Sequence, residues 1–180
     1  MVLVRLWLFR MLVFAAAAVM LVSAIMVWWT VNVEILANAP SGIEEFTVEL
    51  YQHGIPDNFA REYFRADITP SWQVTLAWVY MGVSVALISL SAFLKGNKGR
   101  WLLGITGSVY IIYALACIII MIGRTSAYEI PLQGEVLIEG QSIKQTGFQA
   151  GYYLAYTAGL ACLLLALFRN KILGRIDSKT

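Results

Sequence analysis

The chain has 180 residues, of which 59% are apolar types and only 13% are charged, and its mean hydropathy is +0.71. A typical soluble domain carries about 25% charged residues. The formal net charge is only +2, so the composition is dominated by apolar residues and not by charge. We therefore expect an integral membrane protein rather than a soluble domain.

Four segments lack Asp, Glu, Lys and Arg for long enough to cross a hydrocarbon layer about 30 Å thick, which takes about 20 helical residues. The uncharged segments are 11–33, 68–94, 101–123 and 146–168. They predict membrane-spanning helices at about residues 8–31, 72–94, 101–123 and 147–168. The connecting segments 32–71 and 124–146 are longer than the segment 95–100. The whole chain, 1–180, is thus expected to form a single integral membrane domain.

The connecting segments differ in charge, which predicts the orientation. The two termini and segment 95–100 together hold nine basic residues and one acidic residue, whereas segments 32–71 and 124–146 hold four basic and ten acidic residues. Lys and Arg are retained on the cytoplasmic side of a membrane. We expect a multi-pass protein of the cell membrane with both termini cytoplasmic and with 32–71 and 124–146 as outer loops.

Tryptophans lie at the ends of the predicted helices. Trp28 and Trp29 end the first helix, Trp72 begins the second, and Trp101 begins the third. Trp is favoured at the membrane surface because its ring has an apolar body and a polar edge. These four residues are predicted to be interfacial anchors.

Alternating residues predict strands in both outer loops. Val31, Val33 and Ile35 alternate with polar residues, and so do Phe46, Val48 and Leu50 in the same loop. The second outer loop contains a third such run, 135–139, bracketed by glycines. The predicted fold is a membrane all-α four-helix bundle with a small extracellular antiparallel β-sheet cap. Between the strands, Pro56–Arg65 is interpreted as a short helix.

Aromatic residues of the first outer loop are candidates for partner binding. Tyr and other aromatic side chains supply contact area at low entropy cost. The candidate residues are Tyr51, Phe59, Tyr63 and Phe64, with His53 at the rim. Some of them have an alternative role in supporting the sheet, in which case their loss would damage folding and not binding.

Small residues recur at helical spacing in two of the predicted helices. Gly151, Ala155 and Gly159 repeat every four residues, and Gly104 with Ser108 repeats the spacing in the third helix. Such residues let helix backbones approach closely in lipid, where no hydrophobic drive operates between helices. We predict that they form helix-packing contacts.

Hydroxyl groups are the main polar groups inside the predicted spans. Tyr110, Tyr113 and Tyr156 are expected at similar depth, near Ser84. Hydrogen bonds between helices would satisfy them, and a pocket for a quinone or a lipid headgroup is the alternative. Cys117 and Cys162 fall inside helices and are interpreted as small packing residues.

The sequence offers few groups for chemistry. His53 is the one histidine, no second ligand for a metal lies near it, and no phosphate-binding loop or nucleophile motif is present. No charged residue lies deep in a predicted span, although proton pumps and ion-coupled carriers need one. The chain is predicted not to be an enzyme and to hold no metal or cofactor.

The segment GFQAGYYLAYTAGL, residues 147–160, is similar to the entry of the fourth helix in claudins. With the strand that follows the first helix, the short inner loop and the strand in the second outer loop, the chain resembles the claudin and peripheral-myelin-protein superfamily in topology. Claudins carry a Trp and Gly-Leu-Trp signature and two cysteines in the first outer loop, which contains no cysteine here. The resemblance implies a tetraspan membrane protein with an outer sheet.

Three function classes remain open. The first is a non-catalytic tetraspan whose outer cap mediates protein–protein interaction or assembly. The second is an accessory structural subunit of a larger membrane complex, such as a respiratory one. The third is a small channel or a lipid- or quinone-binding protein. The expected partners are membrane lipids and other membrane or cell-surface proteins, including a second copy of the chain, and no nucleic acid is expected.

Overall fold

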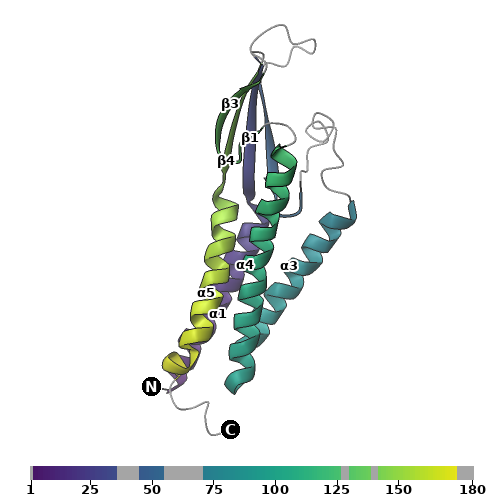
Figure 1. The fold of residues 1–180 in the computed structure, drawn as a ribbon. Coiled ribbons are helices and arrows are strands. Elements are labelled where there is room, and N and C mark those ends of the chain that lie inside the picture. The colour runs from purple at the N-terminus through teal and green to yellow at the C-terminus, as the bar shows by residue number, and fades with distance from the viewer. Residues whose placement is uncertain (1, 36–44, 55–70, 127–129, 139–141, 174–180) are drawn as a thin grey trace. The chain divides into compact units, whose positions relative to one another are not determined.

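The computed structural model describes residues 2–35, 45–54, 71–126, 130–138 and 142–173. Four helices and four strands lie within these ranges (Figure 1). In chain order they are α1 (Val2–Ile25), β1 (Val27–Ile35), β2 (Glu45–Tyr51), α3 (Ser71–Ser91), α4 (Gly96–Ser126), β3 (Gly134–Ile138), β4 (Ser142–Phe148) and α5 (Ala150–Leu173). The predicted short helix 56–65 lies outside the described residues.

The chain divides into two compact units. The helix unit comprises Met1–Val22, Trp78–Ala114 and Leu154–Thr180, and the sheet unit comprises Ser23–Ala77 and Leu115–Tyr153. Each helix contributes residues to both units. The predicted combination of four long helices and a small antiparallel sheet is confirmed, and each unit has a core of its own kind.

The four helices are long and apolar enough to cross a membrane. The candidate spans are Leu3–Ile25, Val74–Ser91, Gly96–Gly123 and Ala150–Leu173, which overlap the four predicted segments. Their surface differs from that of a soluble bundle because many large apolar side chains are exposed. Large side chains such as Ile119 are exposed, whereas many small ones such as Ala158 are buried. This pattern suits a lipid environment, where small residues allow close helix contacts.

The first helix ends earlier than predicted, at Ile25 instead of residue 31. Strand β1 begins only two residues later, so Trp28 and Trp29 lie on a strand and not on a helix. The segment from Val27 onward is rich in β-branched and aromatic residues, which favour a strand. Pairing with β2 on one side and β4 on the other satisfies the backbone groups of β1.

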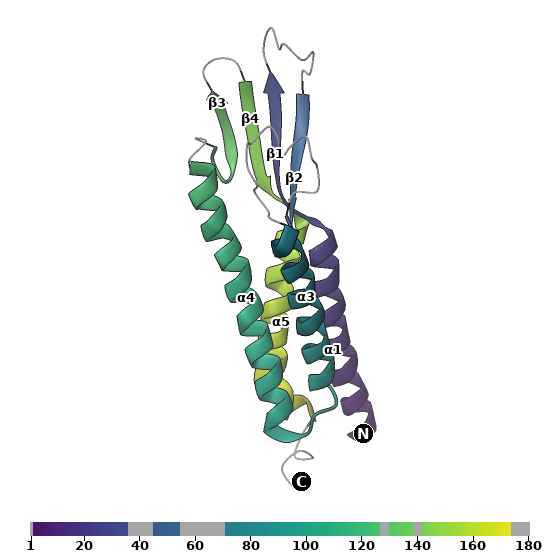
Figure 2. The ribbon, with the colours of Figure 1, turned by 90° about the vertical axis from the view of Figure 1, so that its right-hand side faces the viewer.

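The sheet has four antiparallel strands in the order β2-β1-β4-β3, as Figure 2 shows. The three predicted strands correspond to β1, β2 and β3, and β4 was not predicted. Strand β4 lacks apolar alternation because two of its buried positions hold Lys144 and Thr146. The Thr146 hydroxyl donates a hydrogen bond of 2.8 Å to the Pro131 carbonyl, which satisfies it in the buried layer.

One face of the sheet forms the core of the sheet unit. Trp29, Val31 and Val33 of β1 are buried together with Val48 of β2 and Ile130. The alternation predicted for β1 and β2 is therefore confirmed at these positions. Since side chains alternate along a strand, the other face carries the polar residues.

Candidate functional site

The second face of the sheet carries the exposed polar residues of the strands, and we call it the polar face. Six polar residues from all four strands lie on it: Asn32, Glu34, Thr47, Glu49, Glu135 and Gln145. All six are exposed. The strand register also places Leu137 and Ile143 on this face. The face needs no covering to complete the fold because the apolar layer lies on the opposite face.

A polar row crosses the sheet through neighbouring residues of successive strands. Asn32 of β1 is opposite Thr47 of β2 and Gln145 of β4, and Gln145 is opposite Glu135 of β3. The Thr47 hydroxyl donates to the Asn32 side-chain oxygen at 2.9 Å, and the Gln145 amide donates to the Glu135 carboxylate at 3.2 Å. These cross-strand bonds hold an ordered set of donors and acceptors at the surface.

The polar face is acidic. Glu34, Glu49 and Glu135 bring three carboxylates to it, and none of its six polar residues is basic. Lys144, the basic residue of β4, lies on the opposite face, and its burial lowers the pKa of its amine. The polar face is thus suited to a partner that carries basic or hydrogen-bonding groups.

Tyr51 and His53, two of the predicted partner-binding residues, lie together at the end of β2. A tight turn joins Tyr51 to Gly54 through backbone hydrogen bonds of 2.9 and 3.0 Å, and Gly54 has a φ of 120°, which favours glycine. The Tyr51 and His53 rings are 5.4 Å apart. The Tyr51 hydroxyl donates to the Glu49 carboxylate at 2.7 Å, so this turn adjoins the polar face.

The local environment changes the acidity of both rings. The hydrogen bond to Glu49 raises the pKa of Tyr51, and partial burial and the charge of Glu49 act in the same direction. Burial lowers the pKa of His53, while a hydrogen bond with the Ala24 backbone opposes this effect. His53 is half-buried, so it supports the turn at least as much as it presents a surface. The other three candidates, Phe59, Tyr63 and Phe64, lie outside the described residues.

The four tryptophans predicted as interfacial anchors fall into two groups. Trp72 and Trp101 are 62% and 66% exposed, so both are accessible for such a role. Trp28 and Trp29 are only 3% and 6% exposed, and their indole N–H groups donate to the Ser23 and Leu132 carbonyls, each at 2.7 Å. The Trp pair therefore supports the sheet unit from within.

A close contact surrounds Trp28 where β1 meets the start of α5. A Cβ added to Gly151 would lie 2.7 Å from the Met26 and Val27 carbonyl oxygens and from the Trp28 ring. The Gln149 backbone N–H donates to the Trp28 carbonyl at 2.9 Å, and the Trp28 ring packs edge-on against the Tyr152 ring. Gly151 thus lets the backbones approach at a junction between a helix and a strand, whereas the sequence predicted a helix–helix contact.

The other predicted small residues belong to the helix unit. Ala155 is fully buried. A Cβ on Gly159 would lie 3.2 Å from the Gly107 carbonyl oxygen, and one on Gly107 would lie 2.9 Å from the Gly159 carbonyl oxygen. Gly159 and Gly107 therefore form a close crossing of α4 and α5. Sequence reasoning missed Gly107, although its three-residue spacing from Gly104 was a signal.

Gly104 and Ser108, also predicted to pack, line an open groove on α4. A Cβ on Gly104 would meet the Ala166 Cβ at 3.5 Å, which is an ordinary contact. The α4 backbone is thus less tightly packed at Gly104 than at Gly107.

Arg169 is a buried residue that the sequence placed among the cytoplasmic charges. Its guanidinium donates to the Ser91 carbonyl at 3.0 Å and to the Leu94 carbonyl, and it lies 5.0 Å from the Phe9 ring centre. A Cβ on Gly99 would collide with the guanidinium. Arg169 therefore ties α5 to the end of α3 and to α1, and Gly99 leaves space for it. This charge is structural.

A tyrosine cluster occupies the helix unit. Tyr80 of α3 lies 4.7 Å from Tyr113 and 6.2 Å from Tyr110 between ring centres, and Tyr110 is fully buried. The Tyr110 and Tyr113 rings, three residues apart on α4, lie 6.4 Å apart. The similar depth expected for Tyr156 stays a prediction. Tyr80 joins Tyr110 and Tyr113, which the sequence did not predict. Stacked and tilted rings of this kind stabilise the packing of α3 on α4.

The described residues include no group of three or more His, Cys, Asp and Glu side chains placed to hold a metal ion. No protein-family model matches the chain, and no curated protein matches its sequence. The argument for function therefore depends on the geometry of the two units.

Proposed function

We propose that the chain is a non-catalytic, multi-pass membrane protein whose outer sheet recognises another protein. The polar face is the recognition surface, and the turn at Tyr51 and His53 borders it. Both termini and segment 95–100 are cytoplasmic in this proposal, and the claudin-like topology is part of it.

The observation that carries the proposal is the two-faced sheet. Its apolar face is buried in the core of the sheet unit, whereas its polar face is open and ordered by cross-strand hydrogen bonds. A rigid surface of this kind loses little conformational entropy on binding. The three carboxylates are exposed and lie outside the apolar core, which supports a role in recognition.

The charges support a partner with basic groups. Three carboxylates on one small surface attract a complementary surface and raise its rate of association. Tyr51, next to Glu49, adds an aromatic ring at the border, where it can pack on a partner residue. The surface of another protein can present basic groups to the carboxylates and apolar groups to the Tyr51 ring, so a protein is the expected partner.

A charge placed in the centre of the polar face tests the proposal. Asn32→Arg puts a long cationic side chain at an exposed position of β1, where it would repel a basic partner. Asn97→Arg is the matched control, because Asn97 is also exposed but belongs to the start of α4 in the segment predicted to be cytoplasmic. Both variants should melt like the wild type in mild detergent.

Co-purification after crosslinking in intact cells gives the readout. Asn32→Arg should lose the associated protein, and Asn97→Arg should keep it at the wild-type stoichiometry. An associated protein that stays with Asn32→Arg would overturn the proposal.

An accessory-subunit role is the second candidate, favoured by the exposed apolar side chains along all four helices. In that case the partner is bound through the helices. It would stay with Asn32→Arg and separate only in harsher detergent, which distinguishes the two functions.

A further inference from the structure

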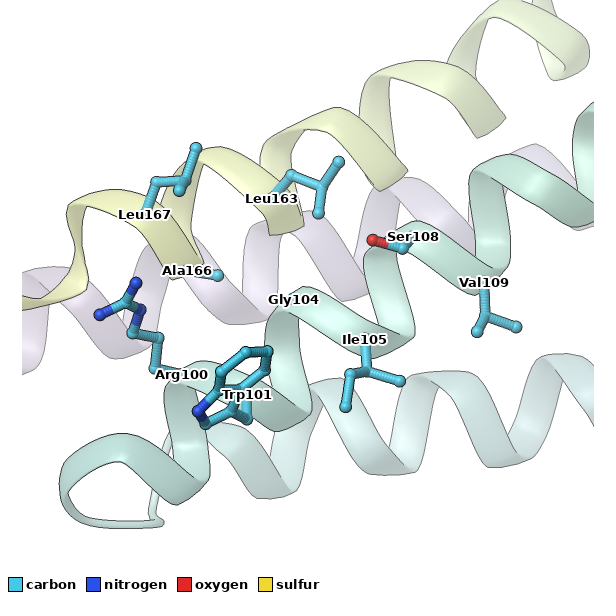
Figure 3. Close-up of a pocket in the computed structure, with 9 residues that line it drawn as sticks. All are labelled: Arg100, Trp101, Gly104, Ile105, Ser108, Val109, Leu163, Ala166 and Leu167. Atoms are coloured by element: carbon cyan, nitrogen blue, oxygen red, sulfur yellow. The ribbon is translucent and has the colours of Figure 1, made fainter.

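A groove of 420 Å³ runs between α4 and α5 in the helix unit. Figure 3 shows its lining, with Arg100 and Trp101 toward one end and Val109 toward the other. The lining residues are Arg100, Trp101, Gly104, Ile105, Ser108, Val109, Leu163, Ala166 and Leu167. Six of these nine residues have aliphatic or aromatic side chains, so the groove is suited to an alkyl chain.

The missing side chain of Gly104 keeps the middle of the groove open. Only the Ala166 Cβ lies within 4 Å of the position that a Gly104 Cβ would occupy, at 3.5 Å. At Gly107, one turn farther along α4, the α5 backbone closes the space. The groove is therefore a local opening beside a tight helix crossing.

The two ends of the groove differ in chemistry. Arg100 and Trp101 are exposed at one end, and a Trp with a neighbouring cation is typical of the headgroup level of a membrane. From there to Val109 the lining follows nine residues of α4, which is about 14 Å of helix. That length is about half of a 30 Å hydrocarbon layer, so the groove is as deep as one leaflet.

We propose that this groove binds a phospholipid with an anionic headgroup. One acyl chain lies over Gly104 between Ile105 and Leu163, and the phosphate group is bound by the Arg100 guanidinium, whose fork of donors matches phosphate oxygens. Basic pockets between helices on the cytoplasmic side of a membrane bind such lipids. This inference goes beyond the proposed recognition role because it concerns the helix unit and needs no protein partner.

The depth and charge of the groove favour a lipid over a helix of another protein. A partner helix that crosses the membrane would pack along about 30 Å, whereas the groove covers about half of this. A partner helix would also have to place residues that complement a cation against Arg100. A lipid matches both the cationic end and the one-leaflet depth.

The test counts lipid bound to purified full-length protein. The protein is reconstituted in bilayers of phosphatidylglycerol and phosphatidylcholine in equal amounts, extracted in mild detergent and weighed intact by native mass spectrometry. Arg100→Gln removes the cation, and Gly104→Leu fills the groove. Lys98→Gln is the matched charge control, because Lys98 is exposed and does not line the groove.

Gly82→Leu is the matched control for the larger side chain. Gly82 is exposed, and nothing lies within 4 Å of the position of its Cβ. We expect Arg100→Gln to lower the amount of bound phosphatidylglycerol about tenfold, the effect of losing one hydrogen bond between charged groups. Gly104→Leu should abolish retention of either lipid, and the two control variants should retain phosphatidylglycerol like the wild type.

Three results would overturn the proposal. The first is unchanged lipid in Arg100→Gln, which tests the site even if Gly104→Leu does not fold. The second is an equal loss in Lys98→Gln, which would indicate attraction by surface charge alone. The third is a wild-type protein that is weighed as a dimer without bound lipid, together with a Gly104→Leu variant that is weighed as a monomer. The groove would then hold a second copy of the chain and not a lipid.

Discussion

The close crossing of α4 and α5 makes a quantitative prediction about two glycines on the same helix. Gly107→Ala adds a methyl group that would lie 2.8 Å from the Cys162 Cβ and 2.9 Å from the Gly159 carbonyl oxygen. Both distances are too short for real contacts, and the second partner is backbone. The helices must therefore separate, and such overpacking costs about 1 to 3 kcal/mol.

Gly104→Ala provides the matched comparison. Its new methyl group would meet only the Ala166 Cβ, at 3.5 Å, so nothing needs to move. Both substitutions gain the same helix propensity of about 1 kcal/mol, which cancels when the two variants are compared. Gly107→Ala should thus be less stable than Gly104→Ala by about 1 to 3 kcal/mol.

Thermal unfolding in mild detergent measures this difference. For a chain of this size, it corresponds to a midpoint about 2 to 12 °C lower for Gly107→Ala than for Gly104→Ala. Gly82→Ala, with open space around its new methyl group, should melt at or above the wild-type midpoint. If Gly107→Ala melts as high as Gly104→Ala, the backbones do not cross closely at Gly107 and the packing argument is wrong.

Three further predictions use the same unfolding assay. Trp28→Phe removes the buried hydrogen bond to the Ser23 carbonyl and should lower the free energy of unfolding by about 1 kcal/mol. Trp72→Phe, at an exposed position, should leave the midpoint unchanged, and equal effects of the two substitutions would contradict the buried role of Trp28. Arg169→Met leaves the Ser91 and Leu94 carbonyls without their charged donor and should lower the free energy of unfolding by about 2 kcal/mol or more. Arg5→Met, at an exposed position, is the control, and an equally small change in both variants would contradict the structural role of Arg169. Because burial lowers the pKa of His53 below its ordinary 6.5, the fold favours neutral His53, so its contribution to stability is present above pH 6.5 and is lost as the pH falls through the lowered value. The midpoint should thus fall less from pH 7.5 to pH 5 in His53→Gln than in the wild type, and identical pH profiles would count against this effect.

The sequence could predict the helices because long uncharged segments have few alternatives in a membrane protein. It could not place the end of α1, since Val27–Thr30 is apolar enough to continue a helix. A strand forms there because β1 pairs on both sides and because the Trp29 indole donates to the Leu132 carbonyl, 103 residues away in the sequence. Pairing across the chain is not visible in a local pattern.

Strand β4 was missed for a related physical reason. Its buried positions include Lys144 and Thr146, which a hydrophobicity pattern assigns to the surface. The Thr146 hydroxyl has an acceptor at 2.8 Å, and a lysine stem can lie along apolar groups. Local sequence therefore indicated a loop where the structure has a central strand.

The sequence predicted that the small residues of α4 and α5 form close contacts, but it did not predict which segments they contact. Gly159 does lie at a close helix contact, yet Gly151 contacts the β1 entry and Gly104 borders a groove. Regular spacing identifies the helix face that carries small residues, but it does not identify the segment that packs on that face. Arg169 was predicted as a cytoplasmic charge because a basic residue after an apolar segment is typical of a membrane boundary, and only the structure shows its carbonyl acceptors.

The candidate recognition site was predicted in part. Tyr51 does border the polar face, but the face itself depends on strand order, which brings Asn32, Thr47, Gln145 and Glu135 into one row. These four residues come from four different strands, and nothing in their local pattern connects them.

The central claim is that the sheet lies outside the cell while segment 95–100 lies inside. Single cysteines at Thr47 on the polar face and at Lys98, in a background where Cys117 and Cys162 are replaced by alanine, test it directly, since both positions are exposed. An impermeant thiol reagent applied to intact cells should label Thr47→Cys and not Lys98→Cys, and both should be labelled once the membrane is permeabilised. Labelling of Lys98→Cys but not Thr47→Cys in intact cells would contradict the account.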